Sequence, residues 1–324
     1  MGEKQNLLSL EDVCIGYETP TGTVRAVVNA TLSLSAGDTL GIVGESGSGK
    51  STLAHGILRL LPKTAVVTGR MMFQDVDLLR CDAKTLKDLR WKDIAVVFQK
   101  SMNSLSPVHK VGEQIVDIYR VHVPQATKEE VYDRMRHLLS VVNLPDRVLD
   151  LYPHQLSGGM LQRISISLSL IHQPKLVIFD EATTALDVVT QGQVLSEIRR
   201  LQSEMHVTSI LITHDVSVVA ETCRRVAVMY AGHLMEVGPV DQVLVSPRHP
   251  YTQGLLASFP SLSGARRRLR GIPGTLPDLK AEPKGCVFAP RCPKAFDRCH
   301  ESMPPAVDTG TGCTVKCHLE GSER

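Results

Sequence analysis

Apolar and polar positions along the first part of the chain predict an α/β fold. Two strand-like stretches, Leu8 to Ile15 and Thr31 to Leu34, are separated by the turn-rich residues 18–22 and predict an antiparallel β region. A short apolar run from Thr39 to Val43 then leads through a glycine-rich loop into a helical pattern from Ser51 to Leu61. This order of strand, loop and helix is typical of α/β proteins.

The middle of the chain has mainly helical patterns before strand patterns return. Lys128 to Val142 places its apolar residues on one side and predicts an amphipathic helix. Further strands are predicted at Ile94 to Phe98, Leu176 to Phe179 and Thr208 to Ile212, and further helices at about Met160 to Ile171 and Val189 to Met205. The alternation favours a parallel sheet.

Periodicity fades after Pro247, where proline, glycine and arginine become frequent. We therefore expect two parts: a core over residues 1–246, with a helical subdomain at about 100–170, and an irregular C-terminal extension over residues 247–324. A chain of 324 residues with 43% hydrophobic content can bury a large core and a smaller appendage.

Charge and hydropathy limit the expected partners. The formal net charge is +2, and the only dense basic run, residues 266–270, is expected to be a solvated loop, so nucleic acid is not an expected partner. The first twelve residues lack the continuous apolar stretch of a signal peptide, and no window supplies the ~20 apolar residues of a membrane-spanning helix. We expect a cytosolic chain whose membrane role is peripheral.

A phosphate-binding loop is the strongest motif. The sequence from Gly44 to Ser51, Gly-Glu-Ser-Gly-Ser-Gly-Lys-Ser, fits the pattern G-x-x-x-x-G-K-[ST] and lies between a predicted strand and a predicted helix. Its glycines let successive N–H groups point at phosphate oxygens, while Lys50 would reach the β and γ phosphates and Ser51 would ligate Mg²⁺. The predicted nucleotide-binding residues are Gly44, Glu45, Ser46, Gly47, Ser48, Gly49, Lys50, Ser51 and Thr52.

Two further apolar strands end in polar residues suited to phosphate chemistry. Asp180 could hold Mg²⁺, and Glu181 could orient the water that attacks the γ phosphate. Alone, such a pair is more often a solvated strand end, but the phosphate loop favours the functional interpretation. His214 follows another strand and could contact the γ phosphate, although a lone histidine is more often structural.

Ser157, Gly158 and Gly159 precede a predicted helix and would form a second anion-binding helix start, although alone they would be an ordinary turn and cap. Together with the other motifs they resemble the signature of ATP-binding-cassette ATPases, over about residues 7–238. The resemblance implies a cassette fold, with ATP as the nucleotide, and head-to-tail dimers in which the signature meets the partner's ATP. It also implies roles for Tyr17 (stacking on adenine), Gln99 (sensing Mg²⁺ and the membrane subunit) and Asp187 (in the loop after the Mg²⁺ strand).

Motifs after residue 247 extend the resemblance to one group within the family. His249 to Leu256, Ile272-Pro-Gly274 and the Pro-Arg-Cys292-Pro segment are similar to the C-terminal extension of oligopeptide and dipeptide importer ATPases. Two residues depart from that family: Ala182 stands where proline is usual, and Leu161 where a basic residue is frequent.

The tail also holds five of the eight cysteines, whereas Cys14, Cys81 and Cys223 are scattered singly. The resemblance implies a [4Fe–4S] cluster, with Cys317 preferred to Cys313 for its Lys-Cys-His setting. Zinc and unligated thiols are the alternatives. The four predicted ligands are Cys286, Cys292, Cys299 and Cys317.

The family implies an ATP-hydrolysing subunit at the cytoplasmic face of the cell membrane, which drives import of short peptides through separate membrane permease subunits. A second ATPase subunit, expected to be a paralogue, and an extracytoplasmic substrate-binding protein would be its other partners. Import of nickel or oligosaccharides is the nearest alternative. A soluble cassette ATPase acting on nucleic acid or ribosomes is disfavoured by the lack of a broad basic face.

Overall fold

A computed structural model describes residues 6–98, 105–182, 187–259 and 271–320. The chain forms two compact units. The first unit consists chiefly of Ser35–Asp38 and Arg80–Ile212, and the second of Gln5–Leu34, Thr39–Leu79 and Thr213–Arg324. Each unit is described by itself.

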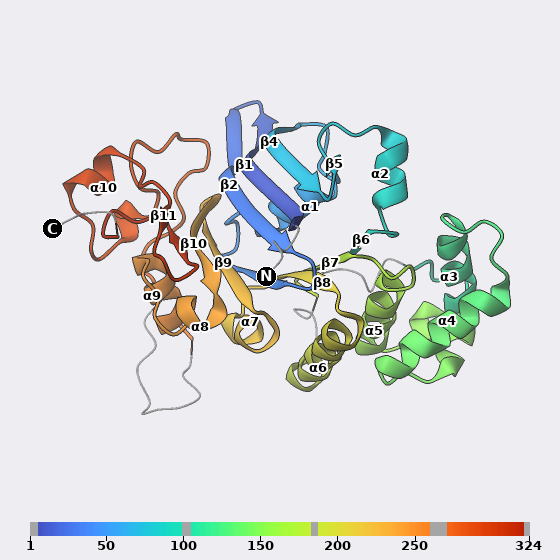
Figure 1. Ribbon diagram of the computed structural model, residues 1–324. Helices are drawn as coiled ribbons and strands as arrows, with labels where there is room; N and C mark the ends of the chain where they lie inside the picture. The colour runs from blue at the N-terminus through green and yellow to red at the C-terminus, as the bar shows by residue number, and fades with distance from the viewer. Residues whose placement is uncertain (1–5, 99–104, 183–186, 260–270, 321–324) are drawn as a thin grey trace. The chain divides into compact units, whose positions relative to one another are not determined.

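The second unit contains a four-stranded antiparallel sheet, drawn in blue and cyan in Figure 1. Its strands, in the spatial order β2-β1-β4-β5, are β2 (Gly22–Ser35), β1 (Asn6–Thr19), β4 (Ala65–Phe73) and β5 (Val76–Asp77). β1 and β2 extend well beyond the short stretches that the sequence predicts. A bulge between Glu11 and Cys14 interrupts the pairing of β1 with β4.

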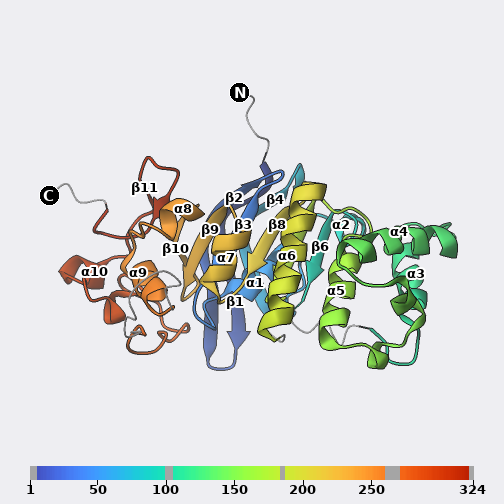
Figure 2. The same ribbon diagram turned by 90° about the horizontal axis from the view of Figure 1, so that it is seen from below.

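The same unit also contains a mixed sheet. The buried strand β3 (Thr39–Val43) pairs in parallel with β9 (Arg225–Tyr230), which turns into the antiparallel β10 (His233–Pro239). β12 (Thr314–Val315) and β11 (Val307–Asp308) from the end of the chain continue this sheet beyond β10. Helix α1 (Lys50–Ile57) follows β3, and α7 (Val216–Thr222) packs on β3, as Figure 2 shows.

The first unit combines three parallel strands with helices. β7 (Leu176–Asp180) lies between β6 (Ile94–Val97) and β8 (Thr208–Ile212), and every residue of the three strands is buried. The helices are α2 (Ala83–Leu89), α3 (Val111–Arg120), α4 (Lys128–Val141), α5 (Gly158–Ser169) and α6 (Val188–Met205), with 3₁₀ turns at Asp146–Asp150 and Pro153–Gln155. The predicted α/β class and parallel pairing are confirmed.

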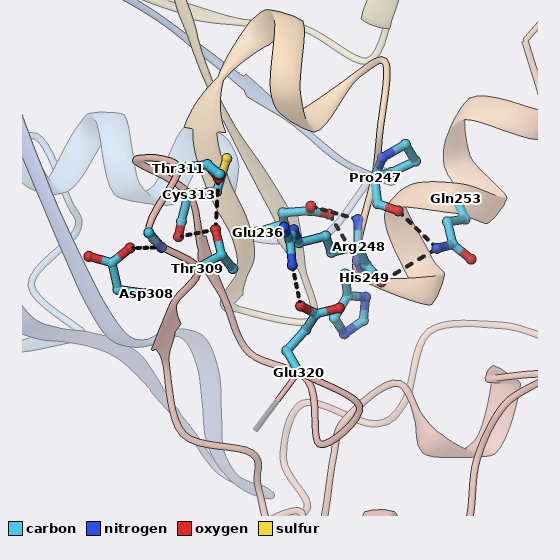
Figure 3. Close-up of polar contacts among 11 residues, drawn as sticks. Glu236, Pro247, Arg248, His249, Gln253, Asp308, Thr309, Thr311, Cys313 and Glu320 are labelled. Carbon is cyan, nitrogen blue, oxygen red and sulfur yellow. Dashed lines mark hydrogen bonds and ion pairs between the residues drawn. The ribbon is translucent and has the colours of Figure 1, made fainter. Parts of the chain in front are cut away.

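The C-terminal extension is anchored on β10. It includes α8 (Val240–Val243), α9 (Pro250–Ala257), a 3₁₀ turn at Ala289–Arg291 and α10 (Asp297–Glu301). Glu236 of β10 is only 1% exposed and accepts hydrogen bonds from the backbone N–H groups of Arg248 (2.9 Å) and His249 (3.2 Å) (Figure 3). The carboxylate therefore fixes the chain just before α9. The boundary near Pro247 stays a prediction.

A second contact closes this anchor from the end of the chain. The guanidinium of Arg248 donates to Glu320 at 2.7 Å, and the two side chains are 41% and 20% exposed. In the turn between β11 and β12, the Thr309 N–H donates to the Cys313 carbonyl at 2.9 Å. The side chain of Cys313 packs on Gly238 of β10, where an added Cβ would lie 2.4 Å from the Cys313 sulfur. Figure 3 shows both regions.

We predict that Glu236→Ala destabilises the extension. The substitution leaves two backbone N–H groups without their acceptor, which costs on the order of 1–3 kcal/mol. Thermal melts of the full chain should show a lower melting temperature, and proteolysis beyond Ser246 should be faster. Glu320→Ala is the matched control, because it removes an ion pair with an exposed arginine worth ~1 kcal/mol or less. Equal effects of the two variants would contradict the anchoring role.

Candidate nucleotide-binding site

The phosphate loop joins β3 to α1 in the second unit, and its glycines are required by the backbone. Gly44, Gly47 and Gly49 have φ values of 153°, 79° and 102°. A Cβ at Gly44 would lie 2.0 Å from the Met229 carbonyl oxygen, and one at Gly49 would lie 2.1 Å from that of Ala26. Neither position can take a side chain without displacing backbone.

The carbonyl groups of the loop have partners within the second unit. Lys50 is 5% exposed, and its ammonium donates to the carbonyl oxygens of Gly44 and Glu45 at 2.8 Å each. The Ser48 carbonyl accepts from the Gly232 N–H at 2.9 Å. Such an arrangement suits a loop whose N–H groups bind phosphate oxygens.

Two predicted ligand residues lie in the same unit as the loop. Tyr17 on β1 is half-buried, and its hydroxyl donates to the Thr52 hydroxyl at 3.3 Å, so the ring lies beside the first turn of α1. The Thr213 N–H donates to the Ile42 carbonyl at 3.2 Å, which places the next residue, His214, beside the end of β3. His214 is exposed. Their contacts with adenine and the γ phosphate stay predictions.

The predicted carboxylates end β7 in the first unit. Asp180 is 5% exposed, and Glu181 follows in a left-handed conformation with φ 49°. The Glu181 N–H donates to the Ile212 carbonyl of the neighbouring strand at 2.9 Å.

The signature residues begin α5 in the same unit. Ser157 is exposed and caps the helix by accepting from the Met160 N–H at 3.3 Å. Gly159 packs so tightly that a Cβ there would lie 2.5 Å from the Thr190 methyl group. Asp187 caps α6 by accepting from the N–H (3.0 Å) and the hydroxyl (2.6 Å) of Thr190. Thr190 therefore links Asp187 to the signature.

A buried contact between Arg163 of α5 and Glu197 of α6 joins these two helices and was missed in the sequence. Arg163 lies 3.7 Å from Glu197 of α6, and its guanidinium also donates to the carbonyl oxygen of Gly159 at 3.3 Å. Glu197 is 5% exposed, and its burial raises the pKa of its carboxyl to about 7, although Arg163 and Asn143 oppose that shift. No local pattern distinguishes Glu197 from Glu204, the exposed carboxylate of the same helix.

The predicted site residues thus fall in both units. The loop residues, Tyr17 and His214 belong to the second unit, whereas Asp180, Glu181, Asp187 and the signature belong to the first. Gln99 lies outside the described residues.

The prediction of a [4Fe–4S] cluster is wrong, and so is that of zinc. Cys286, Cys292, Cys299 and Cys317 do line one cavity, but its volume of about 20 Å³ has room for about one water molecule. Burial raises the pKa of the Cys286, Cys292 and Cys317 thiols, that of Cys286 to about 11. Across residues 6–98, 105–182, 187–259 and 271–320, no group of three or more His, Cys, Asp or Glu side chains is placed to hold a metal ion.

Comparison with known proteins identifies the family. The ABC transporter family model matches residues 27–184, and the model of the oligopeptide/dipeptide transporter C-terminal region matches residues 235–299. The oligopeptide transport ATP-binding protein OppD of Escherichia coli (strain K12) is 41% identical over 313 residues, which cover 96% of this chain and 92% of that protein. The chain belongs to the ATP-binding-cassette family.

Other relatives agree with this assignment. The dipeptide transport ATP-binding protein DppD of Bacillus subtilis (strain 168) is 41% identical over 320 residues, 98% of this chain and 95% of that protein. A solved dimer of the ATP-binding cassette MJ0796 in a post-hydrolysis state, bound to ADP and Pi, has a TM-score of 0.64 and 27% identity, and the match covers 72% of this chain and 98% of that one. Our protein is thus a cassette ATPase coupled to transport, and ATP with Mg²⁺ fits this family. Within the described part of the cassette protein, every helix is too short or too polar to cross a bilayer.

We predict that the stability of this ATPase depends on pH through Glu197. The carboxyl of Glu197 has a higher pKa in the folded chain than the ordinary value of 4.5. The free energy of unfolding is therefore greatest below pH 4.5 and falls by up to about 3 kcal/mol as the pH rises towards 7. Glu197→Gln cannot ionise, so its melting temperature should rise relative to the parent's between pH 5 and pH 7.5. Glu204→Gln, in an exposed pair on the same helix, should track the parent. Parallel curves for parent and Glu197→Gln would contradict the prediction.

Proposed function

We propose that this ATP-binding-cassette protein is the ATP-hydrolysing subunit that energises import of short peptides through separate membrane permease subunits, at the cytoplasmic face of the cell membrane. The observation that supports the peptide cargo is the match that continues beyond the cassette into the tail, over residues 235–299, to the oligopeptide/dipeptide transporter C-terminal region. General cassettes, such as the solved one above, correspond to only 72% of this chain.

Each predicted residue has a role in this proposal. Lys50 and the N–H groups of the loop bind the phosphates, while Ser51 and Asp180 hold Mg²⁺, which neutralises charge on the phosphates. Glu181 orients the attacking water, and His214 contacts the γ phosphate. Tyr17 stacks on adenine, Gln99 senses Mg²⁺ and the membrane subunit, and Asp187 is the aspartate that the family has after the Mg²⁺ strand.

The proposed partners extend beyond the permease subunits. A second ATPase subunit, expected to be a paralogue, would receive Ser157, Gly158 and Gly159 at its own ATP, and an extracytoplasmic substrate-binding protein would deliver the peptide. Nickel or oligosaccharide import is the second candidate, because the cargo is chosen by subunits other than this chain.

We predict that Glu181→Gln abolishes ATP hydrolysis and peptide uptake but keeps ATP binding. The phosphate loop is intact in this variant, whereas the attacking water loses the carboxylate that orients it. The complex copurified from membranes should be reconstituted in vesicles, and uptake of labelled di- to pentapeptides, nickel and oligosaccharides should be measured in parallel. We expect the parent complex to take up peptides but neither nickel nor oligosaccharides, and the Glu181→Gln complex to take up none of the three.

The matched control is Glu11→Gln, which removes a carboxylate from an exposed pair with Arg70. This variant should hydrolyse ATP and transport peptides as the parent does. Undiminished turnover of Glu181→Gln would refute the catalytic assignment, and ATP-driven uptake of nickel or oligosaccharide without peptide would refute the cargo. Failure of the chain to copurify with integral membrane proteins would favour a soluble cassette ATPase.

We predict that Ser157→Arg prevents ATP-driven association with the second ATPase subunit while each chain still binds nucleotide. Ser157 is exposed at the start of α5, so a long cation there meets the partner's ATP site rather than its own core. Light scattering with ATP would report the association. Ser140→Arg, which places the same cation at an exposed position of α4, should associate normally. Normal association and hydrolysis by Ser157→Arg would exclude the head-to-tail arrangement.

A further inference from the structure

Three tail segments converge on the phosphate loop within the second unit, and the hydrolysis mechanism above uses none of them. They are the start of α9, the Ile272-Pro-Gly274 turn and the 3₁₀ turn that ends at Arg291. The residue that two of them contact directly is Glu45, the second residue of the loop. Glu45 follows Gly44, so anything that holds it also holds the start of the loop.

Arg291 supplies the first contact. Its guanidinium is 7% exposed and forms an ion pair with the Glu45 carboxylate at 3.0 Å. The same guanidinium donates to the Tyr230 hydroxyl (3.2 Å) and to the carbonyl oxygens of Pro273 (2.8 Å) and Ile272 (3.2 Å). With these four bonds its orientation is fixed, and the rigid fork of an arginine side chain matches such a set of acceptors.

Tyr251 supplies the second contact. It is fully buried at the start of α9, and its hydroxyl accepts the Glu45 backbone N–H at 3.0 Å. Burial raises the pKa of this phenol, so the hydroxyl stays protonated. The tail therefore holds the side chain of Glu45 through Arg291 and its backbone through Tyr251.

The turn between these segments faces the middle of the loop. Leu276, which follows the Ile-Pro-Gly turn, comes within 3.6 Å of the position that a Cβ on Gly47 would occupy. Gly47 itself has φ 79°, so the loop passes the tail in a backbone conformation that favours glycine.

The negative charge of Glu45 opposes binding of a polyphosphate, so its ion pair with Arg291 affects the affinity of the loop. A carboxylate inside a loop that must hold a polyphosphate repels the ligand, and the repulsion is strong where the site is partly shielded from water. Glu45 is 28% exposed, so solvent screens it only in part. Arg291 compensates the charge from the side of the tail.

We infer that Arg291 and Tyr251 are positioning residues of the phosphate loop, so that the C-terminal extension sets the affinity of this ATPase for ATP by neutralising and orienting Glu45. The inference depends on nucleotide binding by the loop and is independent of the transported cargo.

The test compares the ATP affinity of the full-length parent with that of Arg291→Gln, Glu45→Gln and the double variant. Loss of Arg291 leaves the Glu45 charge uncompensated, so Arg291→Gln should weaken ATP binding on the order of tenfold. The double variant should recover to within about threefold of the parent, because it removes the repelling charge as well. In hydrolysis, KM should rise in Arg291→Gln, while kcat at saturating ATP changes less than about twofold.

Two further variants separate positioning from general loosening of the tail. Tyr251→Phe deletes one hydroxyl without changing the packing volume and should weaken ATP binding about fivefold. Arg248→Gln breaks a different arginine–glutamate pair of the tail, with Glu320, and should bind ATP as the parent does. Parent affinity in both Arg291→Gln and Tyr251→Phe would overturn the inference, as would an equal loss in Arg248→Gln or a double variant that binds no better than Arg291→Gln.

Discussion

The carbonyl oxygens of the phosphate loop need hydrogen-bond donors from the protein if the loop's N–H groups are to bind an anion. The buried ammonium of Lys50 takes two of these oxygens, from Gly44 and Glu45, and the Gly232 N–H takes a third, from Ser48. Gly232 belongs to the turn between β9 and β10, so the hairpin is part of the loop's support. The place of the β9–β10 hairpin beside the loop can be understood from this requirement.

Local patterns were sufficient to predict the parts of the site that depend on nearby residues. The bounds of β3 and β8 agree with the apolar runs in the sequence, and the loop glycines with positive φ are those of the motif. β4 was missed because its exposed start and Gly69 break the alternation of a half-buried strand. The hydrogen bond between Glu45 and Tyr251 joins residues 206 positions apart, and a contact of this separation leaves no periodic signal.

The cysteines show a different limit of sequence reasoning. Cys286, Cys292, Cys299 and Cys317 line one cavity, whereas Cys313 lies elsewhere, against Gly238, but the cluster for which the four were predicted is contradicted. The spacing of cysteines along the chain does not fix the volume that is left between their side chains in the fold. That volume depends on packing by distant side chains, and here packing leaves a cavity of about 20 Å³.

Aromatic packing holds the tail against β9 within the second unit. The rings of Tyr230, Tyr251 and Phe288 are nearly inaccessible to solvent and contact one another, with centroids 4.6 to 5.3 Å apart. Such packing supplies stabilisation but is tolerant of small displacements, whereas the hydrogen-bonded fork of Arg291 fixes one position. Tyr230 belongs to both sets, since its ring packs on Tyr251 while its hydroxyl accepts from Arg291. The aromatic rings that hold the extension thus also orient the Tyr251 hydroxyl and the Arg291 guanidinium, which contact Glu45. The extension is therefore part of the structure that supports the phosphate loop.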